Sequence, residues 1–153
     1  MITPHPIAIV GPTGVGKSAI AEVVALRLGG EIVNADSMQV YRSMDIGTAK
    51  TAPAERRVPH HCLDLVDPGE SYSAALYQRD ARAAIAEILA RGAVPVVVGG
   101  TGLYVRAAMD EFEFASGNLA SDTRHAIEER ARQLGAKALH AELARLDPPS
   151  AAL

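Results

Sequence analysis

A glycine-rich stretch near the N-terminus carries the residues with the clearest chemistry. It fits the pattern G-x-x-x-x-G-K-[ST], and its members are Gly11, Pro12, Thr13, Gly14, Val15, Gly16, Lys17 and Ser18. Glycines let backbone N–H groups approach an anion without a Cβ in the way. Lys17 adds a positive charge, and the Ser18 hydroxyl is suited to hold Mg²⁺. The stretch therefore predicts a phosphate-binding loop, and it leaves open which phosphate is bound.

The residues on either side of this loop have the patterns that such a site needs. Ile7–Val10 is a short apolar run, typical of a buried strand. Lys17–Leu28 is rich in helix formers, and Gly29 follows where a helix end is expected. A strand, a glycine-rich turn and a helix in this order aim the positive end of the helix dipole at the bound anion.

Two further predicted strands end in polar or glycine residues. The strand 31–35 is followed by Asp36 and Ser37, and Val94–Val98 is followed by Gly99, Gly100 and Thr101. The second of these strands is apolar on both faces, as in a parallel sheet covered by helices. Ligands of such sheets bind beyond the carboxyl ends of the strands. We therefore expect these residues and the phosphate-binding loop to share one crevice.

Strands alternate with helices along the chain, which predicts an α/β fold with a parallel sheet. Ser73 is expected to cap a long helix. The remaining predicted elements are a short strand at 61–66, helices at 73–91, 103–109, 121–134 and 136–146, and a loop at 110–120.

Composition indicates a soluble globular chain. It has 153 residues, of which 48% are apolar and 22% are charged, and its formal net charge is −3. Cys62 is the only cysteine, so no internal disulfide is possible, which fits a reducing compartment. No run approaches the roughly 20 apolar residues of a membrane span. We expect a cytoplasmic monomer that does not associate with membranes.

Two chemistries fit these residues. In a small-molecule kinase the loop would hold ATP, and Asp36 would organise Mg²⁺ from the second strand. Alternatively the loop holds a diphosphate that leaves from an allylic carbon, with the Thr101 hydroxyl near the bridging oxygen and Asp36 as general base for an acceptor amine. The pattern alone does not choose between them, and a fragment that only binds nucleotide or RNA is a third possibility.

Several blocks of the sequence, in order, resemble the tRNA dimethylallyltransferases. Besides the loop at 11–18, they are Asn34-Ala-Asp-Ser-Met-Gln-Val-Tyr-Arg42, Met44-Asp-Ile-Gly-Thr-Ala-Lys50, Pro59-His-His61 with Leu63-Asp64, Asp67-Pro68 with Tyr72-Ser73, and Val98-Gly-Gly-Thr-Gly-Leu-Tyr104. These blocks cover most of residues 7–106.

The resemblance implies transfer of a dimethylallyl group from its diphosphate to N6 of an adenine beside the tRNA anticodon. It implies that residues 11–18 hold the diphosphate, that Mg²⁺ sits on Ser18, and that Asp36 and Thr101 are catalytic. The adenine must leave the anticodon stack to reach such a site. Contacts with tRNA are implied for Asp36, Ser37, Met38, Gln39, Thr101 and Arg124.

The resemblance also implies a division of the chain. Residues 1–112 would be an incomplete core with a P-loop NTPase-like parallel sheet, and 113–153 the start of an inserted helical tRNA-binding domain. Members of the family are considerably longer than this chain, so we expect a truncated product in which tRNA binding and turnover are impaired.

Each candidate residue also has a plain structural interpretation. Asp36 could be a solvated strand end, and Thr101 could serve as a helix N-cap. His60, His61 and Cys62 look like metal ligands, but adjacent histidines point apart and no second ligand pair follows. We expect that cluster to be structural.

Overall fold

A computed structural model describes residues 4–110, 114 and 121–153 of the chain. The chain folds as two compact units, Met1–Glu113 and Phe114–Leu153. Most of the predicted loop at 110–120, and the predicted border between residues 112 and 113, fall outside the described residues. The assignment of 113–153 as the start of an inserted domain stays a prediction.

The first unit is built on a four-stranded sheet in which every pairing is parallel, as predicted. Its order is β1-β4-β2-β3, so β4 lies in the centre and its apolar residues are covered on both faces. The strands are β1 (Ile7–Val10), β2 (Gly30–Asn34), β3 (His60–His61) and β4 (Val94–Gly99). The alternation of strands and helices therefore led to the correct fold class.

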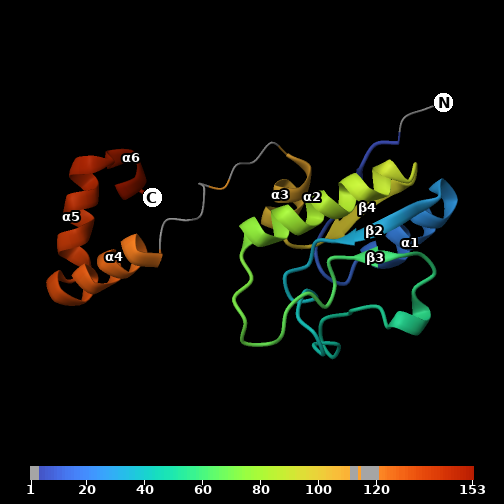
Figure 1. Cartoon of the computed structure of the whole chain (residues 1–153), viewed down its shortest axis with the longest axis horizontal. Coiled ribbons are helices and arrows are strands. Elements are labelled where there is room, and N and C mark those ends of the chain that lie inside the picture. Colours follow the sequence, from blue (N-terminus) through green and yellow to red (C-terminus); the bar gives the residue numbers. More distant parts are fainter. Residues whose placement is uncertain (1–3, 111–113, 115–120) are drawn as a thin grey trace. The chain divides into compact units, whose positions relative to one another are not determined.

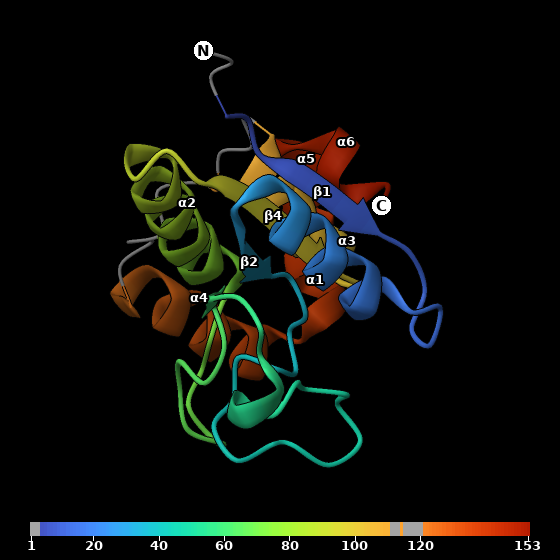
Figure 2. The same cartoon turned by 90° about the vertical axis from the view of Figure 1, so that its right-hand side faces the viewer.

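The helices of this unit cover the two faces of the sheet (Figure 1). They are α1 (Lys17–Leu28), α2 (Ala74–Ala90) and α3 (Gly102–Met109), with a 3₁₀ turn at Pro53–Glu55. Figure 2 shows β4 and β2 between α2 and α1. On the α1 face, Ala21 and Ala25 pack against Ile32, Val96 and Val98.

The opposite face carries the other residues of each strand, because side chains alternate along a strand. There the rings of Tyr77 and Tyr104 stack with centroids 3.9 Å apart. The Tyr77 hydroxyl donates a hydrogen bond to the carbonyl of Asn34, 3.0 Å away, and so joins α2 to the end of β2. As expected, Ser73 caps α2, its hydroxyl accepting from the N–H of Leu76 at 3.2 Å.

The third predicted strand, at 61–66, is wrong beyond His61. Cys62 and Asp64 have φ values of 60° and 55°, which take the backbone out of the extended region. Val66 forms only an isolated parallel bridge, with Tyr41. The segment from Cys62 to Val66 is therefore a loop beyond the short strand β3.

The second unit consists of helices. They are α4 (Ser121–Leu134), α5 (Ala136–Leu146) and α6 (Pro148–Ala151), and the first two begin and end at the predicted residues. Arg130 of α4 pairs with Glu142 of α5, and Asp147 caps α6 by accepting from the N–H of Ser150. Within the described part of the chain, no helix combines the length and apolar character needed to cross a membrane.

Candidate functional site

The glycine-rich loop joins β1 to α1. Gly14 and Gly16 have φ values of 86° and 83°, in the left-handed region that favours glycine. Gly16 is also the N-cap residue of α1, with no side chain capping the helix, so the first N–H groups are free to bind an anion. Lys17 Nζ donates to the carbonyl of Pro12 at 2.6 Å. The loop thus brings N–H groups and an ammonium to one place.

The segment after β2 is ordered by Asn34, which sequence reasoning did not select. Asn34 is 4% exposed, and its Nδ2 donates to the carbonyls of Asp36 at 3.2 Å and Cys62 at 3.1 Å. One carboxylate oxygen of Asp36 accepts from the N–H of Met38 at 2.9 Å. The other carboxylate oxygen of Asp36 has no hydrogen bond within the described residues, so it is available to a ligand.

The segment after β4 is bonded to the segment after β2. The N–H of Thr101 donates to the carbonyl of Ala35 at 3.2 Å, and the N–H of Ser37 donates to Thr101 Oγ1 at 3.0 Å. A Cβ on Gly99 would stand 2.1 Å from the carbonyl oxygen of Ala35, so only glycine allows this approach. Thr101 stands at the N-cap position of α3, yet its hydroxyl makes no capping bond.

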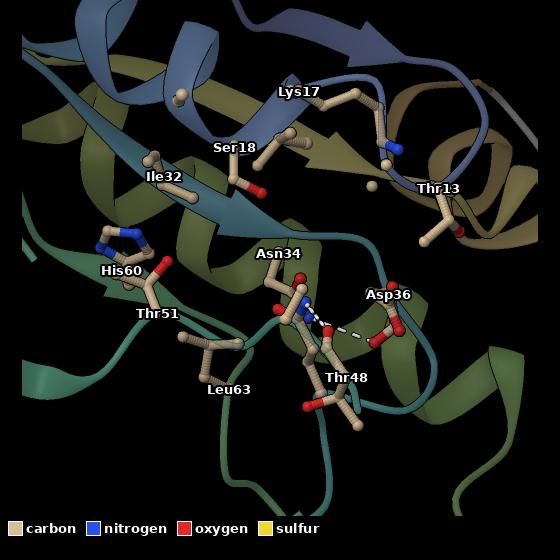
Figure 3. Close-up of a pocket in the computed structure, with 18 residues that line it drawn as sticks. Thr13, Lys17, Ser18, Ile32, Asn34, Asp36, Thr48, Thr51, His60 and Leu63 are labelled. Carbon is tan, nitrogen blue, oxygen red and sulfur yellow. Dashed lines mark hydrogen bonds between the residues drawn. The ribbon is translucent and has the colours of Figure 1, made fainter. Parts of the chain in front are cut away.

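These strand ends border one cavity of about 330 Å³ (Figure 3). From the residues predicted to form the site it brings together Thr13, Gly14, Gly16, Lys17, Ser18, Asp36 and Gln39, with Gly99 and Gly100 beside them. The other predicted residues do not line it: Gly11, Pro12, Val15, Ser37, Met38, Thr101 and Arg124. Ser37 and Thr101 follow the lining residues Asp36 and Gly100 in the chain, and they are hydrogen-bonded to each other.

Arg124 belongs to the second unit. Its guanidinium is paired with Glu128 one helical turn away, Nε to Oε1 at 2.9 Å, and its side chain is 80% exposed. The prediction that Arg124 contacts tRNA stays a prediction.

The wall opposite the phosphate-binding loop contains residues that sequence reasoning missed. They are Thr48, Ala49, Thr51, His60 and Leu63. The cavity is further lined by Ile32 and Val98 on the strands and by Ala19, which follows the loop on α1. Ala49 has a φ of 53°, a left-handed conformation that is uncommon for alanine. The available signal was that Thr48, Ala49, His60 and Leu63 lie within sequence blocks that resemble the family.

A buried lysine holds that wall in place. The Lys50 side chain is 2% exposed, and its ammonium donates to Asp64 and to the carbonyl of Tyr41, each at 2.7 Å. Asp45 lies 3.1 Å from the same ammonium. Burial alone would lower the pKa of Lys50, but the hydrogen bonds to Asp64 and Asp45 outweigh it and raise that pKa above its ordinary value. Lys50 is therefore a charged link between three segments.

The histidine pair has structural partners. His60 Nδ1 lies 2.9 Å from the carbonyl of Val58, and His61 Nε2 lies 2.6 Å from a carboxylate oxygen of Glu31. Burial raises the pKa of the Cys62 thiol to about 12. Among the described residues there is no group of three or more His, Cys, Asp or Glu side chains that could hold a metal ion.

Family models match nearly the whole chain. The IPP transferase model matches residues 39–153, and the isopentenyl transferase model matches residues 5–59. The chain belongs to the IPP transferase family. The family resemblance stated from the sequence blocks is thereby confirmed.

Relatives and solved structures of the family are similar over almost all of the chain. Proteins named tRNA dimethylallyltransferase from Roseiflexus sp. and Kocuria rhizophila are each 54% identical to it, over 95% of the chain and 48% and 46% of their own lengths. The crystal structure of a full-length tRNA isopentenylpyrophosphate transferase from Bacillus halodurans is 48% identical, with a TM-score of 0.70 over 96% of this chain and 49% of that one.

A eukaryotic dimethylallyltransferase acting on tRNA is 32% identical, with a TM-score of 0.82 over 95% of this chain and 37% of that one. These likenesses confirm the predicted P-loop NTPase-like fold of the IPP transferase family. The chain spans about half the length of the curated relatives it matches.

Proposed function

We propose that the protein transfers a dimethylallyl group from dimethylallyl diphosphate to the exocyclic N6 of an adenine next to the anticodon of tRNA. One observation carries the proposal. The phosphate-binding loop and the Asp36 carboxylate border the same cavity, and among the described residues that line it no second carboxylate is present. Relatives of the chain are named tRNA dimethylallyltransferase, and a related solved structure is that of a dimethylallyltransferase acting on tRNA.

In this reaction the adenine amine attacks C1 of the allyl group, and the bond from C1 to the bridging oxygen breaks. The departing diphosphate gains charge, which the loop N–H groups and Lys17 neutralise. Lys17 exchanges its bond to Pro12 for one to a phosphate oxygen. Thr101 follows Gly100, which lines the cavity, and we assign the Thr101 hydroxyl to the bridging oxygen, to which it would turn its proton away from Ser37 Oγ.

Asp36 takes the proton that the amine loses. Its carboxylate is fixed by the N–H of Met38, which leaves an oxygen for the acceptor. Contacts with tRNA are assigned to residues 36–39, Thr101 and Arg124. The 113–153 segment is assigned to an inserted helical domain, and the enzyme is expected to act as a cytoplasmic monomer.

Mg²⁺ fits the oxygen donors of this cavity. Mg²⁺ binds through one or two protein oxygens, phosphate oxygens and water, and so needs no cluster of carboxylates. The Ser18 hydroxyl, at the start of α1, would hold it together with the diphosphate. When bound, the ion supplies further charge neutralisation to the leaving group.

Incubation with labelled dimethylallyl diphosphate, Mg²⁺ and unmodified tRNA tests the proposal. The chain is assayed as it stands and, in parallel, extended to the length of its relatives. We expect label on an adenine N6 and no consumption of ATP. ATP consumption without a prenyl donor would identify a kinase instead, and binding of tRNA without product from either chain would identify a binding protein.

A further inference from the structure

The cavity has two chemically different ends (Figure 3). Lys17 and Asp36 are the residues with a formal charge among the described residues that line it, and both lie away from Ile32, His60 and Leu63. Thr51 lies with the latter three. A ligand that fills the cavity therefore needs a charged part and an uncharged part.

The uncharged end has an apolar floor. Ile32 of β2 and Val98 of β4 lie on adjacent strands of the sheet, and they are 2% and 6% exposed. His60 of β3 pairs with Ile32, and burial lowers the pKa of its ring, which favours the uncharged form. A phosphate would have no charged partner there, so its burial would be unfavourable. Burial of a hydrocarbon group at the same place is favourable.

Leu63 is held rigidly at this end. The backbone is left-handed on both sides of it, at Cys62 and Asp64. Asn34 bonds the carbonyl of Cys62, and the buried Lys50 pairs with Asp64 at 2.7 Å. A side chain fixed between two such anchors cannot easily move aside for a longer ligand.

The cavity volume also favours a short ligand. At about 330 Å³ it is at the lower end of the range of roughly 300–1,000 Å³ typical of small-molecule sites. The diphosphate end and the amine of the acceptor take part of that volume, which leaves room for a small hydrocarbon group.

We propose that Ile32, Val98 and Leu63 form a subsite for the hydrocarbon tail of a prenyl diphosphate, and that Leu63 restricts the tail to five carbons. The inference rests on the proposed function, because it takes the diphosphate to lie on the loop at residues 11–18. It adds the residues that select the length of the donor.

Titration calorimetry in the presence of Mg²⁺ tests the proposed hydrocarbon subsite. The probes are inorganic pyrophosphate, dimethylallyl diphosphate with five carbons and geranyl diphosphate with ten. For the unmodified chain we expect the five-carbon donor to bind at least about tenfold more tightly than either of the others. In Leu63→Ala, the preference for five over ten carbons should fall by about tenfold or more, with pyrophosphate binding unchanged.

Leu65→Ala is the matched control, because Leu65 follows in the same loop but does not line the cavity. It should keep the preference of the unmodified chain. Leu63→Phe fills the subsite, so this variant should bind pyrophosphate normally and lose binding of the five-carbon donor. It provides the test if Leu63→Ala does not fold.

Three results would overturn the proposal, and they separate it from the proposed function. If pyrophosphate binds but the five-carbon donor binds no more tightly, the subsite is absent and the loop assignment stands. If the Leu63 and Leu65 variants behave alike, Leu63 does not select donor length. If neither pyrophosphate nor the five-carbon donor binds, the proposed function itself fails and the subsite with it.

Discussion

The N–H of Ser37 donates to Thr101 Oγ1 at 3.0 Å, although the two residues are 64 positions apart in the sequence. This bond joins the segment after β2, which carries Asp36, to the segment after β4. Thr101 Oγ1 also donates to the Ser37 hydroxyl at 3.3 Å. The Thr101 hydroxyl thus fixes the position of the proposed base, in addition to its assigned place beside the leaving oxygen.

Replacing Thr101 with Val keeps the shape of the side chain and removes the acceptor. A partly buried N–H without a partner costs about 1–3 kcal/mol of unfolding free energy, measured by urea denaturation. We also expect dimethylallyl transfer to fall by at least tenfold. Thr101→Ser should restore both, and an unchanged rate in Thr101→Val would show that this hydroxyl has no part in the reaction.

Gly99→Ala tests the close approach of β4 to the end of β2. The added Cβ would stand 2.1 Å from the carbonyl oxygen of Ala35, so the backbone must shift. We expect a loss of about 1–3 kcal/mol in unfolding free energy. Gly102→Ala is the control, since a Cβ there meets nothing within 4 Å and alanine favours the helix. Equal stability of the two variants would contradict the packing described.

Lys50→Met tests the buried link between three segments. Removal of a hydrogen-bonded ammonium leaves Asp64 and the carbonyl of Tyr41 without their partner, at a cost of about 1.5–3 kcal/mol. The exposed Lys137 provides the control, and Lys137→Met should change stability little. A stable Lys50→Met with an intact cavity would show that the wall does not depend on this lysine.

Lys50 also makes the stability of the folded protein depend on pH. Its pKa in the folded protein is raised above the ordinary value of 10.5, so its contribution is fully present below pH 10.5 and is lost as the pH rises through the folded value. Denaturation of the unmodified chain and of Lys50→Met should therefore give stabilities that converge at alkaline pH. A constant difference between the two would contradict the assignment.

Lys17→Met tests the anion site of the loop. The Lys17 ammonium bonds the carbonyl of Pro12, an exposed contact whose loss should leave the unfolding free energy nearly unchanged. Binding of pyrophosphate should weaken by about 10- to 100-fold, because a charge-assisted hydrogen bond is lost. Arg27→Met, in the last turn of the same helix, controls for the change in net charge. Equal binding by both variants would remove Lys17 from the site.

The parts of the site that depend on local sequence could be predicted. The loop at residues 11–18 is defined by residue types at fixed spacing, and the neighbouring strand and helix follow from apolar runs and a helix-ending glycine. Asp36 was predicted to lie beside the loop because the carboxyl ends of parallel strands meet at one edge of a sheet, and it lines the cavity. Thr101 was predicted by the same reasoning, but it lies next to a lining residue and does not line the cavity itself. The pairing of Ser37 with Thr101 depends on contacts between distant segments, which no local pattern encodes.

The wall of the cavity could not be predicted for a similar reason. Ala49, Cys62 and Asp64 have left-handed backbone conformations that are not expected of alanine or cysteine. Tertiary bonds impose them, among them those of Lys50 with Asp64 and of Asn34 with Cys62. The strand predicted at 61–66 was wrong because its apolar pattern continues where these bonds bend the backbone away from the sheet.

The assignment of Asp36 as the base is the central claim, and one measurement tests it most directly. Transfer of labelled dimethylallyl groups to tRNA is compared between the unmodified protein, Asp36→Ala and Asp110→Ala, whose carboxylate is exposed and outside the cavity. General-base catalysis contributes about 10²- to 10⁴-fold, so Asp36→Ala should slow transfer by that factor while pyrophosphate still binds and Asp110→Ala keeps full activity. Transfer at the full rate in Asp36→Ala would contradict the account.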